Sequence, residues 1–296
     1  MNPVKRSLIS LHFTVMLLGG TALFSKLIPL SATDITFGRS LFGFIALFIV
    51  VKLSGESLKL NNKKDYFVGI GLGIIMAAHW VTYFAAMQYA SVSVGIIALF
   101  TFPVITVLIG PVFEKIRISW QDIVSALVVL VGIGFIVPSA SLTNDVTLGV
   151  IIGVFSAFLY AVRNLSHRKY FSHYSGYKAM AYQMMVICPC LLFFVSDEFT
   201  SMNTKTALML ILLGTVFTAL PHTMVANALK HLRAKTFSLV ACMQPFYGVV
   251  FAIVLLNESP TWQTLVGGLL VISAAVYETV NAHKEQKALK EQTPNS

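Results

Sequence analysis

Ten apolar runs, each long enough to cross a lipid bilayer, follow one another along the chain with short polar segments between them. A membrane-spanning helix needs about 20 predominantly apolar residues, so ten spans use most of the 296 residues and leave no room for a separate soluble domain. Only 11% of the residues are charged, whereas soluble domains carry about 25%. The sequence therefore predicts an all-α membrane protein with ten transmembrane helices, the seventh of which is the weakest because it contains Pro189. The runs cover about residues 7–28, 33–53, 66–88, 92–113, 119–138, 147–167, 178–195, 206–229, 236–256 and 262–282.

The net charge of +9, from 21 Lys and Arg against 12 Asp and Glu, is distributed unevenly. With the N-terminus inside the cell, eighteen basic residues fall in cytoplasmic segments or inner helix ends, and only Lys205 falls in an outer segment. The other two, Lys26 and Arg39, lie in the outer halves of helices. Basic residues mark cytoplasmic loops because they resist translocation, so we expect both termini in the cytoplasm. The excess charge is then a topology signal with some attraction to anionic lipid, and no nucleic-acid partner is expected.

Motifs for metal, cofactor or catalytic chemistry are missing from the sequence. Cys188, Cys190 and Cys242 lie in apolar runs, without the CxxC or His/Cys spacing of a zinc site. The sequence has no HExxH or GxSxG motif, and no span contains a pair of acidic residues. We therefore expect no enzyme activity, no catalytic residue, no metal and no cofactor.

An internal repeat divides the chain into two halves. A shift of 142 residues places Pro103 on Pro245 and Trp120 on Trp262, and the order of apolar runs around them is shared. Five helices per copy is an odd number, so the second copy enters the membrane from the opposite side. Inverted repeats of this kind are typical of secondary transporters. The predicted units are a first five-helix repeat (1–142), a second five-helix repeat (143–283) and a polar cytoplasmic tail (284–296).

Three short motifs occur in the same order in both halves. The first half has Phe102-Pro103-Val104, Phe113-Glu114-Lys115 and Gly132-Ile133-Gly134, and the second has Gln244-Pro245-Phe246, Leu255-Leu256-Asn257-Glu258 and Gly267-Gly268. A further motif, Phe37-Gly38-Arg39, opens the second span. Together they resemble the drug/metabolite transporter superfamily, specifically its EamA-like ten-helix branch. This resemblance implies a bacterial inner-membrane carrier for small metabolites, often an exporter of amino acids or related compounds, with a central cavity between the repeats. The second half has no Arg that matches Arg39, so a symmetric role for that residue is not expected.

Polar residues inside two spans share helix faces, and such residues usually face the bundle interior or a water-filled cavity. In the third span His79 and Tyr83 lie on one face, with Trp80 on the adjacent one; in the sixth span Tyr160 and Asn164 belong to one polar stripe. These five residues are candidates for the wall of a substrate cavity. For His79 the alternative is an interhelical hydrogen bond that serves packing alone.

Prolines mark further cavity candidates in the eighth and ninth spans. Pro221 precedes His222, and a Pro in a span removes a backbone hydrogen bond and can bend the helix. Gln244 and Tyr247, three residues apart, are expected to share a face beside Pro245. The alternative is that these prolines serve packing.

Four charged residues near the membrane boundaries are candidates for gating or structural roles. Arg163 lies towards the cytoplasmic end of the sixth span, so we expect its long side chain to reach the inner headgroups. Arg39 has no carboxylate from a span centre, so we favour a structural or gating pair with Glu258 at the outer surface over direct contact with a substrate carboxylate. Glu114, which ends the fourth span, is the fourth candidate.

These patterns favour a secondary transporter of small metabolites that works by alternating access in contact with the lipid bilayer. The alternatives are an intramembrane enzyme and a receptor or assembly protein without transport activity. Since no acid is placed at mid-membrane, proton coupling would fall to His79 or His222, because imidazole titrates near physiological pH. The sequence does not predict the substrate, the transport direction, the coupling ion or the oligomeric state.

Overall fold

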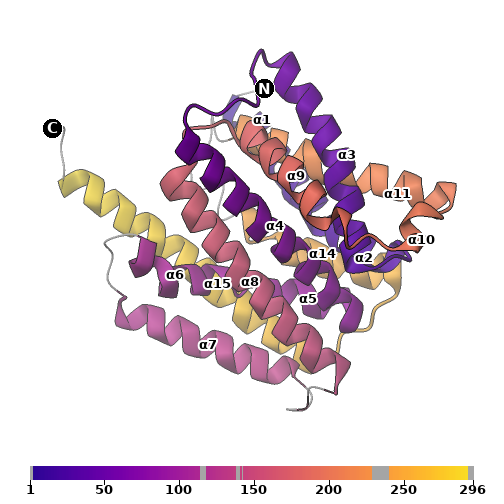
Figure 1. Ribbon diagram of the computed structural model, residues 1–296. Coiled ribbons are helices and arrows are strands. Elements are labelled where there is room, and N and C mark those ends of the chain that lie inside the picture. The colour runs from indigo at the N-terminus through magenta and orange to yellow at the C-terminus, as the bar shows by residue number, and fades with distance from the viewer. Residues whose placement is uncertain (1–2, 114–117, 138–140, 142, 229–239, 293–296) are drawn as a thin grey trace.

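The computed structural model describes residues 3–113, 118–137, 141, 143–228 and 240–292, and within these ranges the regular structure is entirely helical. Figure 1 shows the helices packed as one bundle. In chain order the helices are α1 (Pro3–Gly20), η1 (Thr21–Leu23), α2 (Phe24–Leu27), α3 (Ala32–Leu53), α4 (Lys63–Tyr89), α5 (Val92–Leu99), α6 (Phe102–Phe113), α7 (Trp120–Ile136), α8 (Asp145–Tyr170), α9 (Gly176–Leu192), α10 (Asp197–Thr200), α11 (Thr204–Gly214), η2 (Thr215–Ala219), α12 (Leu220–Ala228), α14 (Gln244–Leu256) and α15 (Trp262–Gln292).

Several helices are long and apolar enough to span a membrane. Six helical stretches among the described residues meet both requirements, and three shorter apolar helices accompany them. The long stretches are Ile9–Leu27, Ala32–Leu53, Lys63–Tyr89, Val92–Phe113, Asp145–Tyr170 and Thr204–Met224, and the shorter helices are Trp120–Ile136, Gln244–Leu256 and Trp262–Glu278. The predicted all-helical class is confirmed. Helix α9 contains Pro189 as expected, whereas α15 continues to Gln292, past its predicted end, because the extension is rich in Ala, Lys, Glu and Gln, which favour helix.

Helix starts are fixed by short polar side chains. Ser119 accepts a hydrogen bond from the backbone of Asp122, whose carboxylate accepts one from the Ser119 backbone, which completes a capping box for α7. Asn62 caps α4 in the same way: its side-chain oxygen accepts a hydrogen bond from the backbone N–H of Asp65, the third residue of that helix. These caps satisfy backbone donors that would otherwise be unpaired at the ends of apolar helices.

The helices of the two halves of the chain pack directly against each other. Helix α4 runs beside α8, α3 beside α9, and α7 beside α15, as Figure 1 also shows. Glycines permit the closest approaches: a Cβ atom on Gly19 would lie 2.9 Å from the backbone oxygen of Gln244, and one on Gly132 would lie 2.8 Å from that of Gly267. Contacts of this kind are typical of helix packing in membranes, where small residues let backbones meet.

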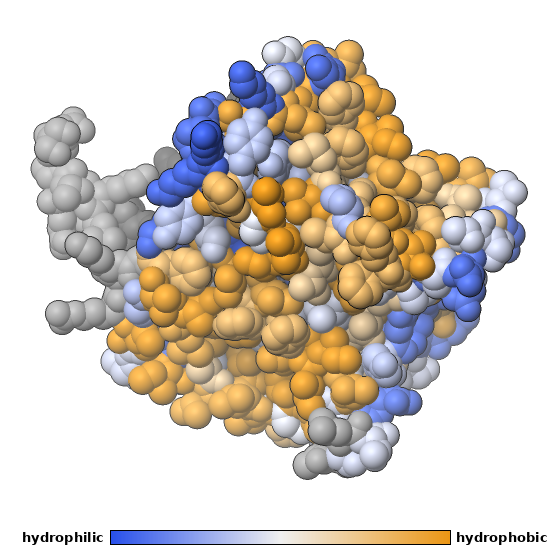
Figure 2. All heavy atoms as spheres, in the orientation of Figure 1, coloured by the Kyte–Doolittle hydropathy of each residue, from blue (hydrophilic) through white to orange (hydrophobic). Residues whose placement is uncertain are grey.

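The outer surface of the bundle is mostly apolar. Figure 2 shows hydrophobic residues over the broad middle of one face, with hydrophilic residues gathered towards its edges. Phe193 is 89% exposed and Leu130 is 65% exposed, and both are among many large apolar side chains at the surface. An apolar surface of this extent is unfavourable in water and suits contact with lipid.

Candidate functional site

A cavity of about 300 Å³ lies inside the bundle, between helices of both halves. Its walls come from α1, η1, α3, α4, α5 and α6 in the first half, and from α8, α12 and the start of α14 in the second. The volume is at the lower end of the range for small-molecule sites, about 300–1,000 Å³. The cavity can therefore hold one small solute.

The structure brings seven of the eight expected cavity residues together at this site. Tyr247 is the exception: it shares α14 with Gln244, but its hydroxyl lies 3.4 Å from Nδ1 of His12 instead. Arg39, which we expected at the outer surface, also lines the cavity. The seven residues are His79, Trp80, Tyr83, Tyr160, Asn164, His222 and Gln244.

His79 is held between the two halves of the chain. Its Nδ1 lies 2.8 Å from Oγ of Ser156 and 3.1 Å from the Ser156 carbonyl oxygen, and Ser156 Oγ donates its own proton to the His79 carbonyl. Nδ1 must therefore carry the proton, which leaves Nε2 of a neutral ring as an acceptor. The ring also stacks on Tyr160, with centroids 4.7 Å apart. His79 thus makes the interhelical hydrogen bond and lines the cavity at the same time.

Arg39 is 3% exposed and is positioned by two neighbours. Its Nε donates to Oγ1 of Thr218 at 2.8 Å, and its guanidinium carbon lies 3.9 Å from the centre of the Trp80 ring. Thr218 Oγ1 donates in turn to the carbonyl of Leu213, five residues earlier. The hydroxyl thus donates its proton to Leu213 and accepts from Arg39 through a lone pair of its oxygen.

The pair that we expected between Arg39 and Glu258 is not formed in this structure. Glu258 lies in the connection between α14 and α15 and accepts hydrogen bonds at the start of α5. Its Oε1 accepts from the Val92 N–H at 2.7 Å, and its Oε2 accepts from Ser93 N–H at 3.1 Å and Ser93 Oγ at 2.7 Å. The carboxylate satisfies donors at a helix N-terminus, which also attracts negative charge. Glu258 therefore joins the second half of the chain to the first.

Arg163 does not reach for the membrane surface. Its Nε donates to Oε1 of Gln183 at 2.9 Å, and Nη1 donates to Oδ1 of Asn164 at 3.0 Å. Gln183 is completely buried on α9, and its amide nitrogen donates to the Ala179 carbonyl. The expected snorkelling is therefore wrong, because a neutral amide on the neighbouring helix supplies an acceptor inside the bundle. The remaining candidate, Glu114, lies outside the described residues.

The helix that carries His222 is irregular beside the cavity. Residues Thr215–Ala219 form a π-helical turn between α11 and α12. Pro221 cannot donate to the carbonyl of Phe217, four residues earlier, and the hydroxyl of Thr21 on η1 donates to this carbonyl instead at 3.1 Å. His222 Nδ1 donates to the Thr218 carbonyl at 2.7 Å. The irregular turn thus provides both the Thr218 hydroxyl for Arg39 and a fixed position for His222.

The chain also breaks at the cavity between α5 and α6. The fourth span was expected as one helix, but α5 ends at Leu99 and α6 begins at Phe102, one residue before Pro103. Phe100 and Phe102 both line the cavity, and sequence analysis missed them because phenylalanines in an apolar run carry no polar signal. The proline after the break is the signal that could have found them, since broken helices in transporters occur at binding sites.

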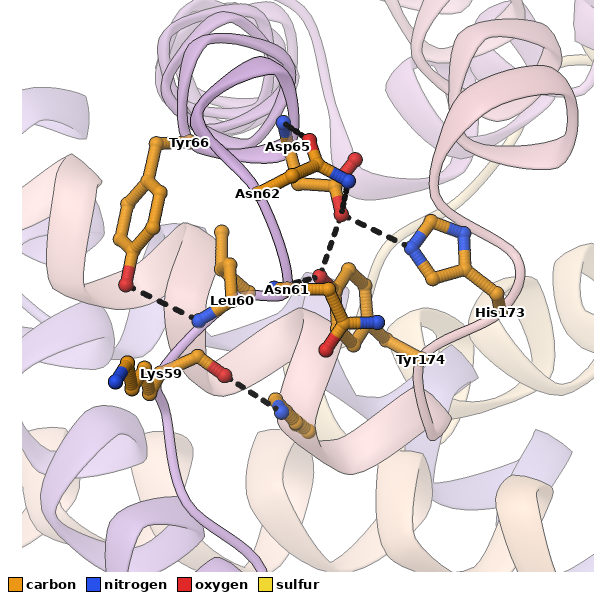
Figure 3. A network of polar contacts seen from close by, with 9 residues as sticks. Lys59, Leu60, Asn61, Asn62, Asp65, Tyr66, His173 and Tyr174 are labelled. Carbon is orange, nitrogen blue, oxygen red and sulfur yellow. Dashed lines mark hydrogen bonds and ion pairs between the residues drawn. The ribbon is translucent and has the colours of Figure 1, made fainter.

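A second polar cluster joins the halves at the end of the bundle where α4 begins (Figure 3). The hydroxyl of Tyr174, between α8 and α9, donates to Oδ2 of Asp65 at 2.6 Å and accepts from the Asn61 N–H at 2.7 Å. Nearby, Lys178 Nζ donates to the Lys59 carbonyl at 3.0 Å. Burial, together with the adjacent Asp65 carboxylate, raises the pKa of Tyr174 above its usual value.

The chain is similar over nearly its whole length to a transporter family and to proteins named as uncharacterized transporters. The model of the EamA-like transporter family matches residues 6–137 and again residues 147–277. An uncharacterized transporter of Bacillus subtilis (strain 168), YxxF, is 23% identical over 93% of this chain and 89% of its own length. An uncharacterized transporter of Archaeoglobus fulgidus is 20% identical over 89% of this chain and 92% of its own. One crystal structure, with 16% sequence identity, superposes with a TM-score of 0.64 over 95% of this chain and 98% of its own, which shows a shared fold.

Proposed function

Since this chain belongs to the EamA-like transporter family, we propose that it is a secondary transporter that moves amino acids or related small metabolites through the cavity between its two halves. The cavity itself carries this proposal. It lies inside an apolar bundle, has room for one small solute, and is lined by polar groups on helices that belong to both family matches. Such a site near the junction of two repeats is typical of carriers that expose it to each side in turn.

The proposed topology has ten transmembrane helices in two inverted repeats, 1–142 and 143–283, followed by a cytoplasmic tail, 284–296. Two family matches of similar length support the repeats, and the distribution of Lys and Arg supports cytoplasmic termini. The inner membrane of a bacterium is the proposed location, and export is the proposed direction.

Alternating access requires contacts that close one end of the bundle while the other opens. Polar contacts join the two halves at both ends. At one end Asp34 accepts from the backbone and the hydroxyl of Ser196, and Glu258 accepts from Ser93. At the other end Tyr174 donates to Asp65. We propose that these two sets of contacts break in turn during transport.

For a proton-coupled transporter, the proposed proton carrier is Nε2 of His79 or His222, for which no partner is found in the part of the chain that the structure describes, because Nδ1 of each ring already donates to a neighbouring group. Purified His79→Ala and His222→Ala proteins in liposomes should then lose uptake driven by a pH gradient but keep exchange of substrate. Retention of full pH-driven uptake by both variants would rule out a histidine relay.

Profiling of exported metabolites tests the proposed function. Leu18 lines the cavity on α1, so Leu18→Trp should obstruct it, whereas Leu130→Trp places the same side chain on the outer surface of α7. Cells that overproduce the wild type or Leu130→Trp protein should accumulate one or more solutes in the medium, and Leu18→Trp cells should not. Identical media from all three strains, at equal amounts of protein in the membrane, would count against transport.

A further inference from the structure

We propose that Arg39 binds the carboxylate of the transported solute, and that the preferred solutes are small organic acids with one carboxylate, an apolar body and a net negative charge. This inference rests on the proposed transport function and names the substrate class of the same cavity.

The first argument is the position of the guanidinium group. Nε is used by Thr218 and one face of the group is covered by Trp80. Among the described residues, no acceptor is found for the terminal nitrogens Nη1 and Nη2, and Arg39 lines the cavity. The group is therefore fixed at one edge and presents its other donors to a solute. Two parallel N–H groups on a planar fork match the two oxygens of a carboxylate.

The second argument is the balance of charge. No Asp or Glu occurs among the described residues that line the cavity. A cation removed from water in the membrane interior is costly unless an opposite charge or several strong acceptors meet it. Arg163, the other Arg in this region, is met by the amide oxygens of Gln183 and Asn164. By comparison, the hydroxyl of Thr218 is the one hydrogen-bond acceptor that Arg39 has among the described residues. A solute with a negative charge therefore stabilises the Arg39 guanidinium more than a neutral solute does.

The third argument is the chemistry of the remaining wall. Tyr160 is packed between His79 and Phe102, with ring centroids 4.7 Å and 4.9 Å away. His79 and Tyr160 stack nearly parallel and Phe102 meets Tyr160 edge to face, so this part of the lining is aromatic and suits an aromatic or branched apolar body. Among the described lining residues an ammonium group would find no carboxylate, only neutral acceptors such as Nε2 of His79, and the Asn164 amide oxygen already accepts from Arg163. The lining therefore favours a hydroxy acid or oxo acid over the amino acid with the same side chain.

A matched set of probes with the same phenyl ring tests this ranking. The probes are 3-phenyllactate, which is an anion, phenylalanine, which is a zwitterion, and 2-phenylethylamine, which is a cation. Each competes with a labelled probe for wild-type protein in detergent and drives counterflow in liposomes. We expect phenyllactate to bind most tightly and phenylethylamine at least about tenfold more weakly, because the amine has no carboxylate to accept charge-assisted hydrogen bonds from Arg39. Equal binding of all three, or tightest binding of the amine, would overturn the inference.

Variants at Arg39 give an independent readout. Arg39→Gln should weaken phenyllactate binding about tenfold or more while it changes phenylethylamine binding little, and Arg39→Lys should retain part of the preference for the anion. Lys26→Gln is the matched control, because Lys26 is a cation that donates to the Gln88 carbonyl away from the cavity. An unchanged ratio of anion to amine affinity in Arg39→Lys would contradict the proposal even if Arg39→Gln failed to fold.

The two proposals can fail separately. Counterflow of the amine but not of the acid would leave the transport function in place and reject the carboxylate site. If no probe bound, the substrate class would be rejected, and export profiling would still decide the transport function. Binding of the acid without any counterflow would support the site and count against transport.

Discussion

Replacement of Glu258 by Gln tests whether the contact between the second half of the chain and the start of α5 stabilises the fold. The carboxylate accepts three hydrogen bonds from Val92 and Ser93. A Gln side chain keeps one oxygen for Val92 but turns an NH₂ group towards the two donors of Ser93. Loss of two charge-assisted hydrogen bonds and of negative charge at a helix N-terminus, discounted for partial exposure, gives a cost of about 2 kcal/mol.

The free energy of unfolding can be measured in detergent micelles by denaturant titration, with thermal melts in the same detergent as a check. Glu258→Gln should be about 2 kcal/mol less stable than the wild type. Glu198→Gln is the matched control, because Glu198 is an exposed acid on α10 and should change stability by less than about 0.5 kcal/mol. If the two variants were equally stable, the assignment of a structural role to Glu258 would be wrong.

Two further contacts lead to quantitative predictions. Gly132→Ala should lower the melting temperature and cost about 1–3 kcal/mol of stability, since its Cβ would meet the Gly267 backbone at 2.8 Å. Gly134→Ala, the control, should be neutral or stabilising because its Cβ meets open space, and equal melting temperatures of the two variants would refute the close packing. Tyr174→Phe should lower the free energy of unfolding, measured by denaturant titration, by about 1–3 kcal/mol because it leaves Asp65 and the Asn61 N–H each without one partner. Tyr170→Phe is the control, and equal stability of the two variants would show that the Tyr174 hydroxyl is not needed.

Much of the helical architecture could be predicted from the sequence because apolar length and polar periodicity are local properties. The stripe with Tyr160 and Asn164 faces the cavity as helical spacing predicts. Tyr247 differs: it follows Gln244 by three residues on α14, but its hydroxyl lies 3.4 Å from Nδ1 of His12 on α1.

The partners of the charged residues could not be predicted, because they depend on how separate helices pack against one another in three dimensions. Thr218, which accepts from Arg39, lies in the π-helical turn, and Gln183 meets Arg163 because α8 and α9 both pack against α4. The sequence places both arginines in spans without an acid at mid-membrane and therefore suggests water or lipid headgroups as their environment. Neutral hydroxyl and amide acceptors carry no charge pattern that would reveal them.

Counterflow in liposomes tests the central claim most directly. Purified protein is reconstituted into liposomes that are loaded with a solute identified by export profiling, and entry of the labelled solute is followed. The proposed mechanism predicts transient accumulation of label with the wild type and with Leu130→Trp, and none with Leu18→Trp, whose side chain obstructs the cavity. Accumulation at the wild-type rate with Leu18→Trp would show that the solute does not pass through this cavity.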